Sequence, residues 1–334
     1  MDEVKRIVSD IKSGNIKPLY VLMGEEPYYI DRIAGFIEGN VLSEEEKGFN
    51  QMVMYGKDVG VGDIVEAAKR YPMMAERQVV IVKEAQELSR TIENLASYAE
   101  QPQPSTVLVI CYKYKTLDKR KKLYKTVKKS GELFESKKLY ENQVGDWIRR
   151  VLAGKKYGIN PKAASMLVEF LGTDLGKISN ELEKLQLVLP PGTEITPVHI
   201  EENIGISKDY NNFELRKAVG ERDVVKATRI IHYFGQNPRD NPFVVTVALL
   251  FNFFSQLLQY HGLSDKSPKN AASALRINLF FVKEYEAAAR NYPMKQVSAA
   301  VTALRELDMK GKGVGAANMP QSDLLKELLV RIMN

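Results

Sequence analysis

Two hydrophobic patterns alternate along the first 140 residues. Val4, Ile7, Val8 and Ile11 recur at the spacing of one helical face, whereas residues 19–23 form a continuous apolar run typical of a buried strand. The same patterns predict further strands at 51–55, 78–82, 106–112 and 132–134, and helices at 30–37, 64–71, 92–100 and 119–129. Strands that alternate with helices predict a mostly parallel sheet covered on both faces.

Beyond residue 140 the pattern is helical. Asn160-Pro161 and Thr196-Pro197 each place a capping side chain before a proline suited to a first helical turn. Helices are predicted at 143–152, 161–171, 175–187, 224–234, 242–261, 279–291, 297–307 and 324–333, with a basic loop at 310–315. The predicted fold is therefore an α/β domain at 1–139 followed by two all-α domains, at 140–208 and 209–334.

Composition narrows the class of protein. The chain has 334 residues, of which 44% are hydrophobic, and a formal net charge of +6, consistent with an anionic partner. Its single cysteine, Cys111, lies in the apolar run 106–112 and is expected in a buried strand, so disulfides are not expected. The start lacks a secretory apolar core, and the longest apolar stretch, 243–254, is too short to span a bilayer. We expect a cytoplasmic protein with no membrane partner.

A parallel sheet followed by helices is common among nucleotide hydrolases, but two features of their site are missing. The loop after the first core strand reads Gly24-Glu25-Glu26-Pro27-Tyr28-Tyr29 and lacks the glycines, lysine and Ser/Thr of a phosphate loop. The two acids are expected to favour the positive end of the next helix. Lys83 stands where an active ATPase needs a magnesium-binding aspartate.

Other catalytic or cofactor sites are not indicated. The three histidines, His199, His232 and His261, are far apart and lack metal-ligand spacing. No nucleophile elbow or Cys/His pair is present. We therefore predict a non-catalytic protein without cofactors that works by binding other macromolecules.

Segments spread along the whole chain resemble the delta subunit of bacterial DNA polymerase III, a component of the sliding-clamp loader. The resemblance is carried by residues 20–28 and 73–82, by Asp174-Leu175 with 178–185, and by 212–215 with 307–311. It implies an ATPase-like first domain without a nucleotide site, a helical lid and a helical collar. It also implies these partners: the sliding clamp (beta subunit), the delta prime and gamma/tau subunits through the collar, and primer-template DNA. In this family the delta subunit opens the clamp ring, and partner subunits hydrolyse ATP.

The resemblance assigns a clamp contact to Met73 and Met74. The family usually has a Leu-Phe-like apolar pair just before Ala-Glu-Arg, and this chain departs from it with Met73-Met74-Ala75-Glu76-Arg77. Two adjacent methionines are by themselves more typical of core packing, but methionine can also fill an apolar pocket. The implied mechanism is a short helix that offers an apolar anchor to a groove.

A basic run follows the predicted strand at 106–112. The candidates for contact with DNA phosphates are Lys119, Arg120, Lys121, Lys122 and Lys125. Such a run is more often a solvated helix face than a nucleic-acid site, and both interpretations stay open. Two alternatives to a clamp-loader subunit also stay open: a free-standing basic nucleic-acid-binding protein and an active ATPase of related fold.

Overall fold

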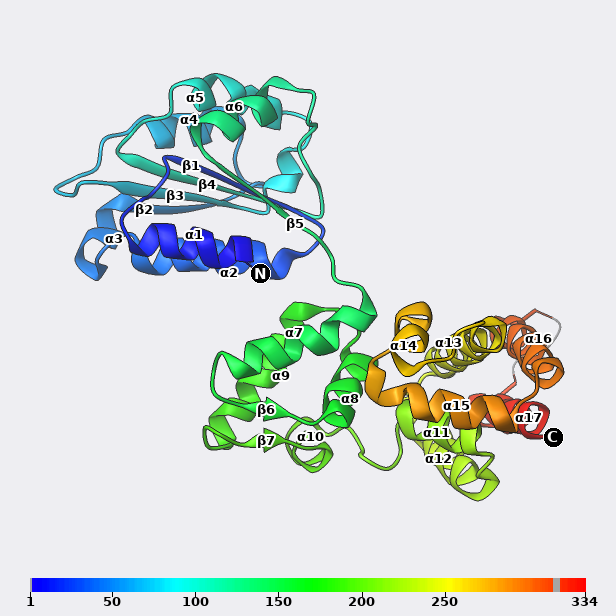
Figure 1. Cartoon of the computed structure of the whole chain (residues 1–334). Coiled ribbons are helices and arrows are strands. Elements are labelled where there is room, and N and C mark those ends of the chain that lie inside the picture. Colours follow the sequence, from blue (N-terminus) through cyan, green and yellow to red (C-terminus); the bar gives the residue numbers. More distant parts are fainter. Residues whose placement is uncertain (1, 315–318) are drawn as a thin grey trace. The chain divides into compact units, whose positions relative to one another are not determined.

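The computed structural model describes residues 2–314 and 319–334 and divides into two compact units, Met1–Leu139 and Tyr140–Asn334. A five-stranded sheet forms the centre of the first unit, with the strand order β2-β3-β4-β1-β5 (Figure 1). The strands are β1 (Leu19–Gly24), β2 (Gln51–Tyr55), β3 (Gln78–Lys83), β4 (Thr106–Lys113) and β5 (Glu132–Ser136). Every neighbouring pair is parallel, which confirms the predicted α/β fold.

Helices cover both faces of this sheet (Figure 1). One face packs on α1 (Asp2–Lys12) and α2 (Pro27–Asn40), and the other on α4 (Val61–Lys69), α5 (Ala96–Glu100) and α6 (Lys122–Ser130). Two short 3-10 helices, η1 (Ala85–Leu88) and η2 (Ile92–Leu95), precede α5. Since β4 is covered on both faces, Cys111 is buried, and burial raises the pKa of its thiol to about 12.

The first unit differs from the sequence prediction in several helices: the one predicted at 119–129 begins at Lys122, and the one at 92–100 is divided into η2 and α5. The helix predicted at 64–71 ends at Lys69, so Tyr71 belongs to the following loop. A short helix, α3 (Glu44–Asn50), was not predicted because it lacks an apolar stripe. It is instead fixed by a capping box, in which Ser43 and Glu46 each satisfy the other's backbone N–H.

The second unit is almost wholly helical. Its elements before residue 209 are α7 (Glu141–Ala153), β6 (Gly158–Ile159), α8 (Pro161–Leu171), α9 (Leu175–Val188), β7 (Glu194–Ile195) and α10 (Pro197–Ile204). The parallel β6–β7 pair corrects the all-α prediction for this segment. Asn160 caps α8 as predicted, with its side chain accepting from the N–H of Lys162 at 2.8 Å. The boundary at 208/209 stays a prediction.

The rest of the unit packs around one hydrophobic core. It comprises α11 (Asn212–Glu221), α12 (Val224–Gln236), α13 (Phe243–Gly262), α14 (Pro268–Leu275), η3 (Leu279–Phe281), α15 (Val282–Asn291), α16 (Met294–Gly311) and α17 (Gln321–Met333). The basic loop predicted at 310–315 is wrong at its start, because α16 continues through Gly311. Gly315 lies outside the described residues.

Helix α13 is longer than the apolar stretch 243–254 that the sequence analysis judged too short to span a bilayer. It has 20 residues and, by length and composition alone, is apolar enough to cross a membrane. Yet one stripe of its side chains, including Val247, Phe254 and Leu257, is buried in the core shared by α11–α17. Core packing therefore accounts for this stripe of apolar side chains.

Candidate functional site

The loop after β1, where a nucleotide-binding relative of this fold would hold phosphate, is closed by bonds within the protein. Gly24 donates its N–H to the carbonyl of Lys115 at 2.9 Å, and Glu26 donates to the carbonyl of Ser136 at 3.5 Å. The Glu26 side chain, almost fully buried, caps α2 by accepting from the N–H of Tyr28 at 3.0 Å. These three amides, which could otherwise cradle phosphate oxygens, already have protein acceptors.

The carboxyl ends of the neighbouring strands carry ion pairs that the sequence did not reveal. The Lys113 ammonium lies 2.9 Å from both Asp31 and Glu84 carboxylate oxygens, and Lys83 lies 3.1 Å from Glu38. Burial alone would lower the pKa of Lys113, but the two carboxylates raise it. The hydrogen bond from Lys113 lowers the pKa of Glu84. Lys113, at the end of β4, is therefore ion-paired within the domain.

Residues 70–77 form the loop between α4 and β3, termed the anchor loop, and present the predicted methionine pair to solvent. Met73 is 63% exposed and Met74 is fully exposed. The core-packing interpretation of the pair is therefore wrong. Tyr71, in the same loop, is 79% exposed, so the loop displays three large apolar side chains together.

The anchor loop is held at both ends. The buried side chain of Gln78 donates to the carbonyl of Arg70 at 2.5 Å and to the Thr106 hydroxyl at 2.8 Å, and Thr106 in turn bonds to Ala68. In mid-loop, the Asn50 side chain accepts from the Met73 N–H at 2.6 Å and donates to the Met73 carbonyl at 2.9 Å. The loop is therefore fixed although it is exposed.

The expected short helix at the methionine pair is absent. Residues 70–77 form no helix, and Met74 has a φ of +53°, in the left-handed region. That conformation costs a residue with a side chain about 1 kcal/mol and is incompatible with a regular helix. The Asn50 bonds, which come from a residue 23 positions away, stabilise a shape that no local pattern could indicate.

The basic run is exposed but partly neutralised. Three of the five candidates are ion-paired: Lys119 with Glu135 at 3.1 Å, Arg120 with Asp118 at 2.9 Å, and Lys122 with Glu100 at 2.7 Å. Lys121 and Lys125 are exposed and form no ion pair with any residue that the structure describes. Among the five candidates, the charge available to a phosphate is therefore that of Lys121 and Lys125.

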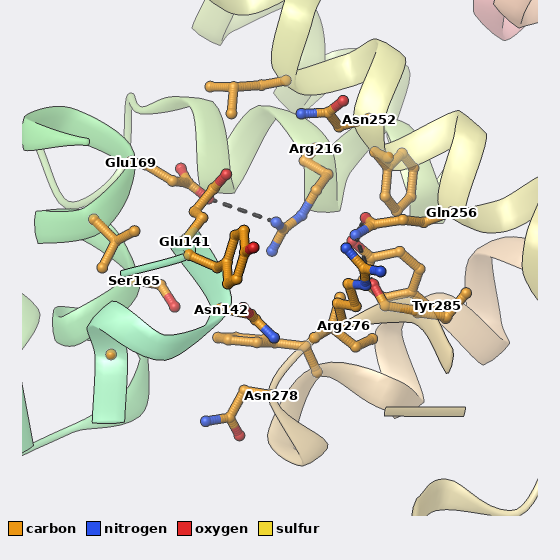
Figure 2. A pocket seen from close by; sticks show the side chains of 18 of the residues that line it. Glu141, Asn142, Ser165, Glu169, Arg216, Asn252, Gln256, Arg276, Asn278 and Tyr285 are labelled. Atoms are coloured by element: carbon orange, nitrogen blue, oxygen red, sulfur yellow. Dashed lines mark hydrogen bonds and ion pairs between the residues drawn. The ribbon is translucent and has the colours of Figure 1, made fainter. Parts of the chain in front are cut away.

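The second unit contains a pocket of about 720 Å³ that the sequence did not indicate (Figure 2). Arg216 on α11 reaches into it, 3.5 Å from Glu169 on α8 and 3.8 Å from Glu284 on α15. Its guanidinium also lies 4.8 Å from the centre of the Phe213 ring and 5.7 Å from that of Phe281. Arg216 thus joins three helices.

Comparisons with known proteins agree along the chain. The family model described as DNA polymerase III, delta subunit matches residues 20–137, and the model of its C-terminal domain matches residues 209–329. The chain is 28% identical over 314 residues to DNA polymerase III subunit delta of Bacillus subtilis, covering 90% of each. It matches the solved Bacillus subtilis DNA clamp loader delta protein with a TM-score of 0.57 at 26% identity, covering 99% of both chains. Because the two models describe parts of one protein and together span most of this sequence, the chain belongs to the DNA polymerase III delta subunit family.

Proposed function

We propose that this clamp-loader subunit binds the sliding clamp through Met73 and Met74 and holds the clamp ring open while other subunits hydrolyse ATP. The exposed methionine pair on a loop fixed by Asn50 and Gln78 carries this proposal. An interface of this kind needs a few apolar anchors that enter a pocket on the partner. A loop that is already ordered loses little conformational entropy when it binds.

Replacing both methionines by alanine is expected to weaken binding to the clamp of the same organism by about 2 kcal/mol, or roughly 30-fold. The change removes the apolar surface that is 63% exposed at Met73 and fully exposed at Met74, so the fold should be unaffected. Surface plasmon resonance on the full chain measures the affinity, and thermal unfolding checks the fold. Met294→Ala, at a methionine 51% exposed in the second unit, is the matched control.

The results of this binding experiment test the proposed function and the proposed site separately. Unchanged binding of the double variant would remove the methionine pair from the interface and leave clamp binding to another surface. Absence of binding by the unaltered chain at micromolar concentration would contradict the proposed function itself. A free-standing nucleic-acid-binding protein would then become the better proposal.

The proposal includes the partner subunits. Helices α12 and α13 expose apolar side chains in adjacent pairs: Val224, Val225, Val244 and Val245. Surfaces of this composition suit packing against other helical subunits, here delta prime and gamma/tau. A clamp-loader subunit works where replication proceeds, so the proposal places it in the cytoplasm with no membrane partner. The closed loop at Gly24 argues against the ATPase alternative.

Primer-template DNA is a further partner in this proposal. We expect Lys121→Glu/Lys125→Glu to weaken DNA binding by the assembled clamp loader and to reduce the slope of log K against log salt by about 2, because each cation contacts a phosphate. Fluorescence anisotropy over a salt series provides the measurement. Lys5→Glu/Lys57→Glu changes charge equally at exposed positions outside the basic run and serves as control. A slope equal to that of the unaltered protein would identify α6 as a solvated surface.

A further inference from the structure

The Asn50 side chain connects the anchor loop to a second exposed apolar residue. Asn50 ends α3 and is only 4% exposed, with its carboxamide bonded to both backbone groups of Met73. The residue before it, Phe49, is 77% exposed. These bonds bring the end of α3 and the middle of the loop together, although 23 positions separate them in sequence. Phe49 is therefore the chain neighbour of the residue that holds the methionine pair in place.

The backbone around Phe49 is fixed by hydrogen bonds at both ends of α3. The capping box of Ser43 and Glu46 fixes the start of α3, and Asn50 donates a further bond to the Glu46 carbonyl at 3.2 Å at its end. The chain then enters β2 at Gln51, which pairs with β3. A phenylalanine held in this way offers a large apolar area at low entropic cost, which flexible methionines do not.

The Asn50 bonds also hold a conformation that the loop would not choose alone. Met74 adopts a φ of +53°, a region that residues with a side chain populate sparsely. Backbone strain of this kind persists where the surroundings determine it, and it concentrates at binding sites. Without the Asn50 carboxamide, the Met73 N–H and carbonyl would turn to water, and the loop would populate other shapes.

We propose that Asn50 is the positioning residue of the clamp-binding loop and that Phe49 is a third anchor, so that one clamp surface contacts both α3 and the anchor loop. This inference rests on the proposed function and deepens it. The occupant is the sliding clamp, because exposed Phe49 directly precedes Asn50, whose bonds to Met73 hold the methionine pair. Asn50 would raise the affinity for the clamp by increasing the fraction of molecules whose anchor loop has the binding conformation.

The test uses the full chain and its clamp. Phe49→Ala is expected to weaken binding about tenfold, and Asn50→Ala to weaken it by a similar factor through loss of two hydrogen bonds. Asn40→Ala is the matched control for Asn50, because Asn40 also ends a helix and donates to the carbonyl four residues earlier, but has no bond to the loop. Phe170→Ala, at a phenylalanine 50% exposed in the second unit, is the control for Phe49.

Two readouts separate positioning from general stability. Hydrogen exchange at the Met73 amide should accelerate in Asn50→Ala but not in Asn40→Ala, because only Asn50 accepts its proton. In the Met73→Ala/Met74→Ala background, Asn50→Ala should have little further effect on affinity. Should Asn50→Ala fail to fold, Asn50→Asp replaces it: it retains the acceptor for the Met73 N–H and loses the donor to the Met73 carbonyl, and its affinity should be lower than that of the unaltered chain.

Two results would overturn the inference. If the methionine variant loses binding while Phe49→Ala and Asn50→Ala bind like the unaltered chain, the two-segment interface is wrong and the proposed function stands. If the unaltered chain does not bind the clamp, both the function and this inference fail.

Discussion

Arg216→Leu is expected to lower the free energy of unfolding by about 3 kcal/mol at pH 8, at the lower end of the range for a buried ion pair, because the Arg216 and Glu169 side chains are still 18% and 13% exposed. The substitution leaves Glu169 and Glu284 facing each other without their shared cation. It also removes the guanidinium that lies against the Phe213 ring. Urea unfolding followed by circular dichroism measures the loss. Arg305→Leu, at an exposed arginine of α16, should change stability by less than about 0.5 kcal/mol.

The loss from Arg216→Leu should depend on pH. Burial raises the pKa of Glu169 to about 7, although Arg216 acts in the opposite direction. Because the folded state binds the proton more tightly than the unfolded state, stability falls as pH rises from the ordinary glutamate value through about 7. Removing Arg216 raises this pKa further, so the variant should lose less stability at pH 5, where Glu169 is protonated. Equal losses at pH 5 and pH 8 would contradict the charge account.

Gly24→Ala is expected to destabilise the first unit by about 4 kcal/mol, since two unfavourable effects add. Gly24 has a φ of +127°, which residues with a side chain rarely adopt, and a Cβ there would lie 2.0 Å from the Ser136 carbonyl oxygen. Strands β1 and β5 would have to separate where they meet. Thermal unfolding of the full chain measures the effect.

A matched glycine makes this second prediction specific. Gly35 lies within α2, where an added Cβ would meet no neighbouring atom within 4 Å, so Gly35→Ala should be neutral or stabilising by up to about 1 kcal/mol. A similar loss at Gly24 and Gly35 would show that close packing of β1 on β5 is not the cause. A stable Gly24→Ala protein would mean that the loop can open, and nucleotide binding should then be tested on it.

Much of the fold could be predicted because its signals are local. Apolar runs located the strands, since a parallel sheet buries both faces of each strand, as in β1 and β4. Helix α3 was missed because Glu44-Glu45-Glu46-Lys47 offers no apolar stripe, although Ser43 with Glu46 is a capping-box signal. The β6–β7 pair, at two residues per strand, is too short for any periodicity.

The resemblance gave the candidate residues, but the sequence could not give the geometry around them. The resemblance singled out Met73 and Met74, and the structure places both in solvent. Their loop conformation depends on Asn50, and the role of Arg216 depends on Glu169, partners that lie 23 and 47 positions away. Such pairings arise from tertiary packing, so no pattern within a helix or strand indicates them.

The Asn50 tether has a consequence for how this surface can change during evolution. Asn50 bonds to the N–H and carbonyl of residue 73 and not to its side chain. Any residue except proline, which lacks the N–H, can therefore replace Met73 without loss of the tether. The conformation of the loop therefore does not depend on which side chain stands at position 73. If the pocket on the clamp changes in size during evolution, a substitution at position 73 can restore the fit while the Asn50 bonds and the loop conformation stay the same.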